Sequence, residues 1–114
     1  KEKIEEMSQI PFEIKRVFWT YYTPEEVIRG KHAHYETEMV LIAAAGIIKV
    51  KTEQIDGSIH EFILDKPDIG LLIPKMCWHT MQYSHNAVQI VIASSLYSES
   101  DYIRSYESFK SQQI

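Results

Sequence analysis

The sequence predicts an all-β fold, a barrel or sandwich of antiparallel strands with one short helix near the C-terminus. Short runs rich in β-branched and aromatic residues recur at intervals of about 8–12 residues, and turn-forming residues separate them. Helical periodicity occurs only near the C-terminus. A chain of 114 residues is long enough to bury one core, so we expect residues 1–114 to form a single domain.

The first half of the chain contains three expected strands. Residues 11–22 alternate apolar and polar side chains and then become aromatic, as in a half-buried strand. A loop is expected at residues 23–26, which include a proline. Two more strands are predicted at residues 40–42 and 47–52, on either side of a turn or bulge at Gly46.

The second half begins with the strongest turn signal in the sequence. Asp56-Gly57 favours the positive φ angles of a tight hairpin, so residues 47–54 and 58–64 are expected to pair. Three shorter strands are then expected at residues 69–74, 80–83 and 88–93.

The C-terminal segment has a helical pattern. Apolar and aromatic residues recur there at helical spacing: Tyr102, Ile103, Tyr106 and Phe109. Ser98 or Ser100 could supply the N-cap, with acidic residues in the first turn. We expect this helix to pack on the outside of the barrel or at its mouth.

Composition excludes several classes of function. The formal net charge of -4 is not that of a nucleic-acid-binding protein, so no nucleic-acid partner is expected. The apolar windows are far shorter than the ~20 residues that span a bilayer, and we expect neither a membrane partner nor a signal peptide. Cys77 is the only cysteine and cannot form an internal disulfide, which fits a cytoplasmic protein. Such a cysteine more commonly serves as a small packing residue at a strand end than as a nucleophile.

Four residues form the main candidate site. His32 and His34 are two positions apart, so on a strand both side chains point to the same face. Glu38 lies another even step away, and His79 follows a second short strand. The alternative is that the histidines line a surface or barrel without a role. His60 and His85 lie in polar, turn-like contexts and are expected to be plain surface residues.

The spacing of these four residues resembles the two sequence motifs of the cupin superfamily, His-x-His-x3-Glu…Gly and Pro-x-Gly-x2-His. The resemblance implies an RmlC-like antiparallel β-barrel or jelly roll. The match has two departures: Gly46 falls one place late, and Met76 replaces the glycine of the second motif. Fold alone does not identify the chemistry, because one fold hosts many activities.

A finer resemblance, over roughly residues 10–109, is to the sugar-nucleotide 3,4-ketoisomerases. Residues 11–18 look like the family's Pro-Phe-x-Ile-Lys-Arg-Val-Tyr/Phe strand, and residues 29–34 match its Arg-Gly-x-His-Ala-His motif. Residues 70–81 are similar to its second barrel motif, and residues 93–106 to its Ala-Ser-x-Tyr-Tyr-x-Glu-x-Asp-Tyr-Ile-Arg-x-Tyr ending.

One segment and two positions depart from the family pattern. Nothing corresponds to the family's N-terminal strand with an Asp-x-Arg-Gly-x-Leu element, which helps form the site and is exchanged between subunits. Met39 stands where the family commonly has Gln, and Trp19 where it commonly has an active-site Tyr. These changes remove polar groups from the expected pocket.

The resemblance implies an isomerase of deoxysugar and polysaccharide biosynthesis that moves the carbonyl of dTDP-4-keto-6-deoxyglucose from C4 to C3 through an enediolate. It implies His32 as the base and His34 as its acid or shuttle partner, because imidazole has a pKa near neutrality. No metal or other cofactor is expected. The partner is a thymidine diphosphate-linked hexose, and a homodimer is expected. The implied substrate-binding residues are Arg16, Trp19, Tyr21, Arg29, Glu38 and His79.

Two alternatives stay open. A metal-dependent cupin enzyme would use His32, His34, Glu38 and His79 as ligands. A non-catalytic cupin would bind a nucleotide sugar without turnover, and the missing N-terminal strand together with the Trp19 and Met39 changes favours this reading. Tyr35 could also stack on the ligand, although aromatic residues on strands more often belong to a core or an interface.

Overall fold

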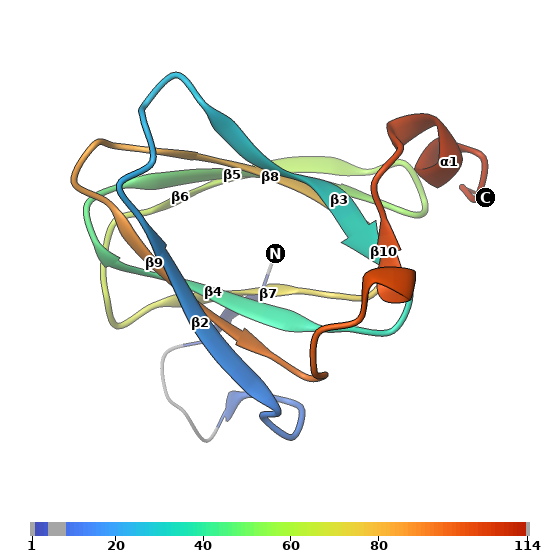
Figure 1. Ribbon diagram of the computed structural model, residues 1–114, viewed down its shortest axis with the longest axis horizontal. Helices are drawn as coiled ribbons and strands as arrows, with labels where there is room; N and C mark the ends of the chain where they lie inside the picture. The colour runs from blue at the N-terminus through green and yellow to red at the C-terminus, as the bar shows by residue number, and fades with distance from the viewer. Residues whose placement is uncertain (1, 5–8, 114) are drawn as a thin grey trace.

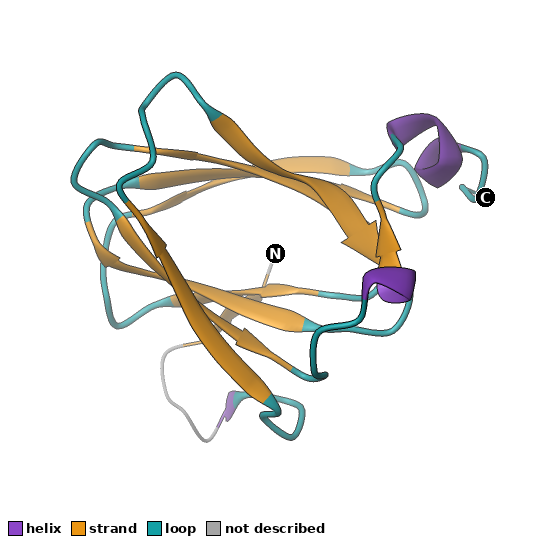
Figure 2. Cartoon of the chain, viewed as in Figure 1, coloured by secondary structure: helices purple, strands orange, loops and turns teal. Residues whose placement is uncertain are grey.

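Two antiparallel sheets face each other in the computed structural model, which describes residues 2–4 and 9–113 (Figures 1 and 2). The first sheet has the order β1 (Glu2–Ile4), β7 (Gly70–Ile73), β4 (Met39–Ala45), β9 (Val88–Ala93) and β2 (Arg16–Tyr21). The second has the order β10 (Tyr102–Ile103), β3 (Ile28–His34), β8 (Cys77–Tyr83), β5 (Ile48–Gln54) and β6 (Ile59–Leu64). The predicted all-β jelly roll is therefore confirmed.

The hydrophobic core lies between the two sheets. Alternate residues of β4 point inward, and Met39, Leu41 and Ala43 are buried there. Ile48 and Val50 of β5 meet them from the second sheet, while the intervening lysines are exposed. Burying each of the larger side chains contributes roughly 1.5–3 kcal/mol, so the period-2 pattern fixes which face of each strand turns inward.

The predicted strands and turns between residues 11 and 93 are present, with shifted ends. The strand expected at residues 11–22 begins only at Arg16, and β8 begins at Cys77, three residues before the predicted start. The Asp56-Gly57 hairpin joins β5 to β6 as expected. Gly46 forms the predicted irregularity, with a φ of 72°.

The strand β1 was not predicted. Its three residues pair with β7 at the edge of the first sheet, with Lys3 opposite Leu71. So short a segment with two charged residues carries no strand signal. Residues 5–8 lie outside the described part of the chain.

The expected C-terminal helix is shorter than predicted. A 3-10 turn, η2, covers Glu99–Asp101, the strand β10 follows, and only Tyr106–Lys110 form the α-helix α1. The N-cap is Ser105, whose side chain accepts a hydrogen bond from the backbone N–H of Ser108, so the proposed caps at Ser98 and Ser100 are wrong. The helical spacing of Tyr102 was overridden by its pairing with β3.

The helix α1 packs against the outside of the second sheet near β3 and β10 (Figure 1). Phe109 is fully buried in a second cluster with Ala33 and Ile103, against which Trp78 also packs. Among the described residues, no helix is both long and apolar enough to cross a membrane.

Candidate active site

Three histidine rings meet on the inner face of the second sheet. His32 and His34 of β3 lie on the same side of the strand, with ring centroids 4.9 Å apart. His79 of β8 is paired with His32 across the strands, and its ring centroid is 4.8 Å from that of His32 and 6.1 Å from that of His34. His34 and His79 are buried and His32 is half-buried. The alternation of β3 therefore brings the predicted pair together.

A bulge in β3 brings Arg29 onto the histidine face. Gly30 and Lys31 both have positive φ angles, 84° and 59°, and the register with β8 shifts between Gly30 and His32. Arg29 therefore pairs with the core residue Met81, on the same inner face as His32, although the two are an odd number of positions apart. A Cβ at Gly30 would lie 2.8 Å from the carbonyl oxygen of His79, so glycine is required there.

Hydrogen bonds to backbone carbonyls fix the tautomers of two rings. His32 Nδ1 lies 3.0 Å from the carbonyl oxygen of Gly30, and His79 Nδ1 lies 3.0 Å from that of Cys77. A carbonyl oxygen only accepts, so in the neutral rings each Nδ1 carries the proton. The lone pair is then on Nε2 in both rings, and the Nε2 atoms of His79 and His34 are buried without a hydrogen-bond partner.

Burial keeps these imidazoles neutral. Desolvation, followed by the charges of His79 and His34, lowers the pKa of His32 from 6.5 to about 3. Desolvation and then His79 lower the pKa of His34 to about 4, whereas Asp101 acts in the opposite direction. Complete burial also lowers the pKa of His79. All three rings are therefore proton acceptors in the unliganded protein at neutral pH.

The C-terminal segment forms a wall that sequence reasoning did not assign to the site. The ring of Tyr102 lies 5.0 Å from that of His32 and 4.5 Å from that of His34. Arg104 lies 4.1 Å above the Tyr102 ring and makes a bidentate pair with Glu99, at 2.6 and 2.9 Å. The sequence did not reveal this role of Tyr102, because the segment has a helical pattern whereas Tyr102 reaches the site by pairing with β3 as a strand residue.

Arg16 faces the site from the opposite sheet. It pairs with the core residue Ala93, which places it on the inner face of β2, and its charge contributes to lowering the pKa of His34. Its guanidinium lies 4.9 Å from the ring centre of Phe18 and 5.7 Å from that of Tyr97, and its Nε is buried without a hydrogen-bond partner. Such an unsatisfied cation suits an anionic ligand.

Trp19 and Tyr21 do not share this face within one protomer. They pair with Ile90 and Val88, whereas Phe18 pairs with the core residue Val91. Directly paired residues lie on the same side of a sheet, so Trp19 and Tyr21 point outward, and they are 61% and 52% exposed. The structure thus separates these two predicted substrate-binding residues from the histidines. Tyr35, in the turn after β3, is also exposed.

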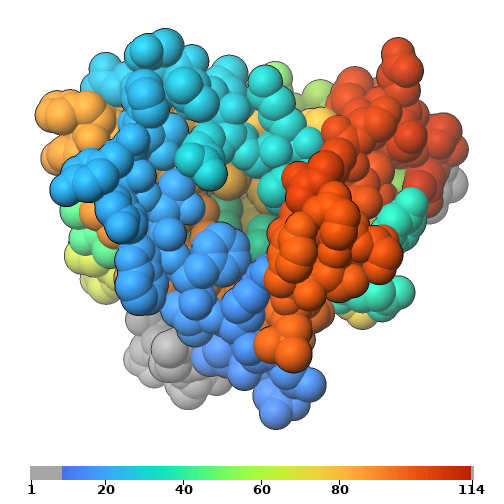
Figure 3. Space-filling view, in the orientation of Figure 1, coloured from blue at the N-terminus to red at the C-terminus, as the bar shows by residue number. Residues whose placement is uncertain are grey.

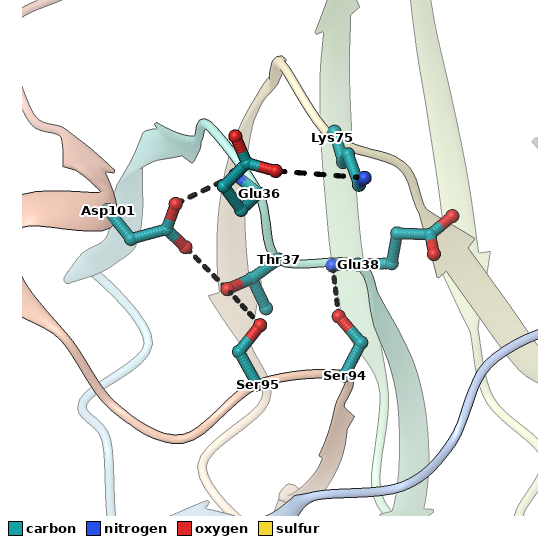
Figure 4. Close-up of polar contacts among 7 residues, drawn as sticks. All are labelled: Glu36, Thr37, Glu38, Lys75, Ser94, Ser95 and Asp101. Carbon is teal, nitrogen blue, oxygen red and sulfur yellow. Dashed lines mark hydrogen bonds and ion pairs between the residues drawn. The ribbon is translucent and has the colours of Figure 1, made fainter.

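The metal alternative predicts that Glu38 joins the three histidines. Glu38 lies at the end of the turn before β4, and its carboxylate points away from Thr37 and Asp101 in Figure 4. Within residues 2–4 and 9–113, no group of three or more His, Cys, Asp or Glu side chains is arranged to hold a metal ion. The set of four metal ligands therefore stays a prediction.

The remaining sequence candidates behave as ordinary structural residues. Cys77 is buried, and burial raises the pKa of its thiol to about 11, which disfavours a nucleophilic thiolate. His60 and His85 are exposed, as expected. His85 lies 3.4 Å from a carboxylate oxygen of Glu25.

The molecular surface is hollowed at the centre of the face seen in Figure 3, between the blue N-terminal strand, the cyan segment and the orange C-terminal segment. These colours correspond to the parts of the chain that carry Arg16, the histidine pair and Tyr102. The fold and this inward-facing cluster define the class of protein, an RmlC-like cupin barrel with a histidine site between its sheets.

Comparisons with known proteins identify the family. Residues 2–113 match the family described as FdtA, WxcM-like, C-terminal, and the chain belongs to that family. It is 44% identical over 109 residues to the TDP-4-oxo-6-deoxy-alpha-D-glucose-3,4-oxoisomerase of Aneurinibacillus thermoaerophilus, covering 94% of this chain and 77% of that protein.

Two solved structures of 3,4-ketoisomerases are similar to this chain in fold. A 3,4-ketoisomerase from Helicobacter canadensis superposes with a TM-score of 0.87 at 39% identity, over 95% of this chain and 81% of that one. A histidine-to-asparagine mutant of the 3,4-ketoisomerase from Thermoanaerobacterium thermosaccharolyticum, in complex with TDP-4-keto-6-deoxyglucose, has a TM-score of 0.87 at 33% identity, over 95% and 78%. The predicted resemblance to sugar-nucleotide 3,4-ketoisomerases is confirmed.

Proposed function

We propose that this protein is a TDP-4-keto-6-deoxyglucose 3,4-ketoisomerase, in which His32 is the base. The protein is an isomerase of a nucleotide-linked deoxyhexose, as its relatives are. The observation that carries the assignment of the base is the hydrogen bond from His32 Nδ1 to the carbonyl of Gly30, which leaves a lone pair on Nε2 beside the ring of His34.

The reaction requires a proton to leave C3 and a proton to reach C4. The C4 carbonyl acidifies the C3 hydrogen, so His32 Nε2 accepts that proton and the bonding electrons form a C3–C4 enediolate with charge on the C4 oxygen. His34 then passes a proton between the oxygens on C3 and C4, and protonation of C4 leaves the carbonyl at C3. Two imidazoles on one strand face serve both positions without moving the sugar.

The low pKa values of the unliganded site rise when the substrate binds. A bound diphosphate brings negative charge toward the histidines and offsets both the desolvation and the like-charge repulsion that lower their pKa values. In this proposal Arg16 and Arg29 bind the diphosphate through charge-assisted hydrogen bonds. Neither arginine makes an ion pair within the described residues, whereas Arg104 is already paired with Glu99.

The roles of His79, Glu38, Trp19 and Tyr21 in substrate binding remain predictions. His79 forms the floor of the site, since it is fully buried beneath the pair. We infer that the outward side chains of β2 belong to a homodimer interface, because Val17, Trp19 and Tyr21 are 49%, 61% and 52% exposed on one sheet face. In such a dimer Trp19 and Tyr21 would contact substrate only across the interface.

We also infer that the enzyme acts in the cytoplasm, in deoxysugar and polysaccharide biosynthesis. The unpaired thiol of Cys77 supports a reducing compartment.

Isotope exchange tests the function directly. The protein is incubated with TDP-4-keto-6-deoxyglucose in deuterated water, and the sugar is analysed by NMR and mass spectrometry. We expect deuterium at C3 or C4 and a 3-keto product. The His32→Asn variant should lose roughly 100- to 10,000-fold in rate, the usual size of a general-base contribution.

His85→Asn is the matched control, because His85 is exposed and lies outside the site. It should exchange deuterium at the rate of the unmodified protein. Binding of the nucleotide sugar without any exchange would contradict the isomerase proposal, and full exchange by His32→Asn would remove His32 from the role of base.

A further inference from the structure

The turn that follows the histidine strand is held by side chains from a distant part of the sequence (Figure 4). The backbone N–H of Glu38 donates to Ser94 Oγ at 2.8 Å, and the hydroxyl of Thr37 lies 3.1 Å from Ser95 Oγ. The backbone N–H of Ser94 donates in return to the carbonyl of Glu38 at 3.0 Å. Residues 35–38 are therefore clamped to the segment after β9.

Asp101 contacts three consecutive residues of this turn. One carboxylate oxygen accepts from the backbone N–H of Glu36 at 2.7 Å, and the other accepts from the hydroxyl of Thr37. The backbone carbonyl of Asp101 accepts from the N–H of Tyr35 at 3.0 Å. The three residues that immediately follow His34 thus all donate to Asp101.

This arrangement fixes the end of β3 on two sides. Tyr102, the next residue after Asp101, pairs with His34 across β10 and β3 and places its ring 4.5 Å from the imidazole. On the side of β8, the N–H of Met76, the residue just before that strand, donates to the carbonyl of His34 at 2.7 Å. Asp101 adds a further constraint, because it holds the turn that directly follows His34.

Asp101 is also close enough to act on His34 by its charge. Burial, His79, Arg16 and Arg104 all lower the pKa of His34, and the carboxylate of Asp101 opposes them. The His34 ring and the Asp101 carboxylate make no hydrogen bond to each other, so this effect acts through space.

We propose that Asp101 is a positioning residue for His34, because its carboxylate holds the turn after β3 and so keeps the two imidazoles in the geometry that proton transfer requires. This inference rests on the proposed ketoisomerase function. Asp101 does not touch the reacting carbons. It acts through the backbone of residues 35–37.

Three variants of the full chain test the proposal. Asp101→Ala removes the two hydrogen bonds that the Asp101 carboxylate accepts, from Glu36 and from Thr37. Asp101→Asn is isosteric and can still accept from Glu36, while its amide can donate to the hydroxyl of Thr37. Asp56→Ala is the matched control, because Asp56 accepts two hydrogen bonds from Ser58, at 2.9 and 2.7 Å, in the hairpin between β5 and β6.

We expect Asp101→Ala to lower kcat by about 100-fold with KM changed less than about twofold, since small misplacements of a catalytic group have effects of this size. Asp101→Asn should retain at least about ten times the kcat of Asp101→Ala. Asp56→Ala should keep the kcat of the unmodified protein. Should Asp101→Ala fail to fold, Thr37→Val should give a smaller loss in kcat, because it removes the contacts of the Thr37 hydroxyl with Asp101 and Ser95 but keeps the bond from Glu36 to Asp101.

The imidazole NMR resonances of the resting protein provide a second reading that needs no turnover. Asp101→Ala should shift the resonances of His32 and His34, and Asp56→Ala should not. An unchanged kcat in Asp101→Ala, or an equal loss in Asp101→Asn, would overturn the proposal. If the unmodified protein fails to exchange deuterium, the proposed function is wrong, and the resonances still decide whether Asp101 positions His34.

Discussion

The hydrogen bonds of single histidine rings decide what the site can do. A carbonyl partner at Nδ1 makes His32 and His79 acceptors at Nε2, whatever the ligand. A mutation that moved the carbonyl of Gly30 would no longer hold the proton of His32 on Nδ1, although the imidazole itself would be unchanged. Because a Cβ at Gly30 would lie 2.8 Å from the carbonyl oxygen of His79, that position is sensitive to any substitution.

The lowered histidine pKa values predict acid sensitivity of folding. Above about pH 6.5 the rings are neutral in both the folded and unfolded chain, so they contribute no pH dependence. Below that pH the histidines of the unfolded chain become protonated. In the folded chain they stay neutral until the pH reaches their lowered pKa values, about 4 for His34 and about 3 for His32. The free energy of unfolding should therefore fall by up to about 1.4 kcal/mol per pH unit for each buried histidine.

Urea unfolding at several pH values measures this slope. His32→Asn should reduce the slope below about pH 6.5 by up to about 1.4 kcal/mol per pH unit, whereas His85→Asn should leave it nearly unchanged. Equal slopes for the unmodified protein and His32→Asn would show that the ring of His32 is protonated in the folded protein as easily as in the unfolded one.

At the scale of elements, local patterns predicted most of the barrel but not its irregularities. Short runs of strand composition between turn residues located β4, β5 and β9, and Asp56-Gly57 located the hairpin. The bulge at Lys31 has no sequence signal, because lysine does not favour a positive φ. Its φ of 59° is imposed by the register with β8. Met76, which stands in place of the glycine of the cupin motif, has a φ of 54° and also carries no such signal.

Two glycines with positive φ allow the destabilisation from backbone strain to be separated from the destabilisation caused by steric overlap of an added Cβ. Gly46 has a φ of 72°, and a Cβ there would lie 2.6 Å from Ala87 Cα and 2.7 Å from Ser84 Oγ. Gly57 has a φ of 90° and no atom within 4 Å of such a Cβ. Gly57→Ala should cost about 1 kcal/mol from backbone strain, and Gly46→Ala roughly 1–3 kcal/mol more from overpacking.

Denaturant unfolding of both variants at neutral pH checks this difference. The close contact at Gly46 involves the backbone of Ala87, which cannot rotate away as a side chain would. A Gly46→Ala variant as stable as Gly57→Ala would mean that the turn between β4 and β5 relaxes at little cost.

At the scale of the whole molecule, the site depends on contacts between segments far apart in the sequence. The histidine pair was predictable, because its geometry follows from two positions of one strand. Asp101 and Tyr102 were not, because they reach the pair over more than 60 residues through η2 and β10, and Glu36 and Asp101 are 65 positions apart. Sequence periodicity describes one helix or strand at a time, so it carries no information on contacts between distant segments.

At the same scale, the outward face of β2 is an exposed apolar patch. Val17, Trp19 and Tyr21 expose apolar surface on the outer side of the strand that carries Arg16 on its inner side. In the proposed homodimer a second copy covers this outer face. Burying a tryptophan at the centre of an interface typically contributes 2 kcal/mol or more, which corresponds to about 30-fold in the dissociation constant.

Trp19→Glu should therefore shift a homodimer toward monomer, with the dimer dissociation constant raised at least about 30-fold in analytical ultracentrifugation. Ile63→Glu is the matched control, because Ile63 is 55% exposed on β6 of the other sheet and should leave the dimer intact. A dimer broken by Ile63→Glu and not by Trp19→Glu would place the interface on the second sheet. A monomeric unmodified protein would leave the Trp19 face without a partner copy, and the site would then have to bind its substrate with the residues of one chain.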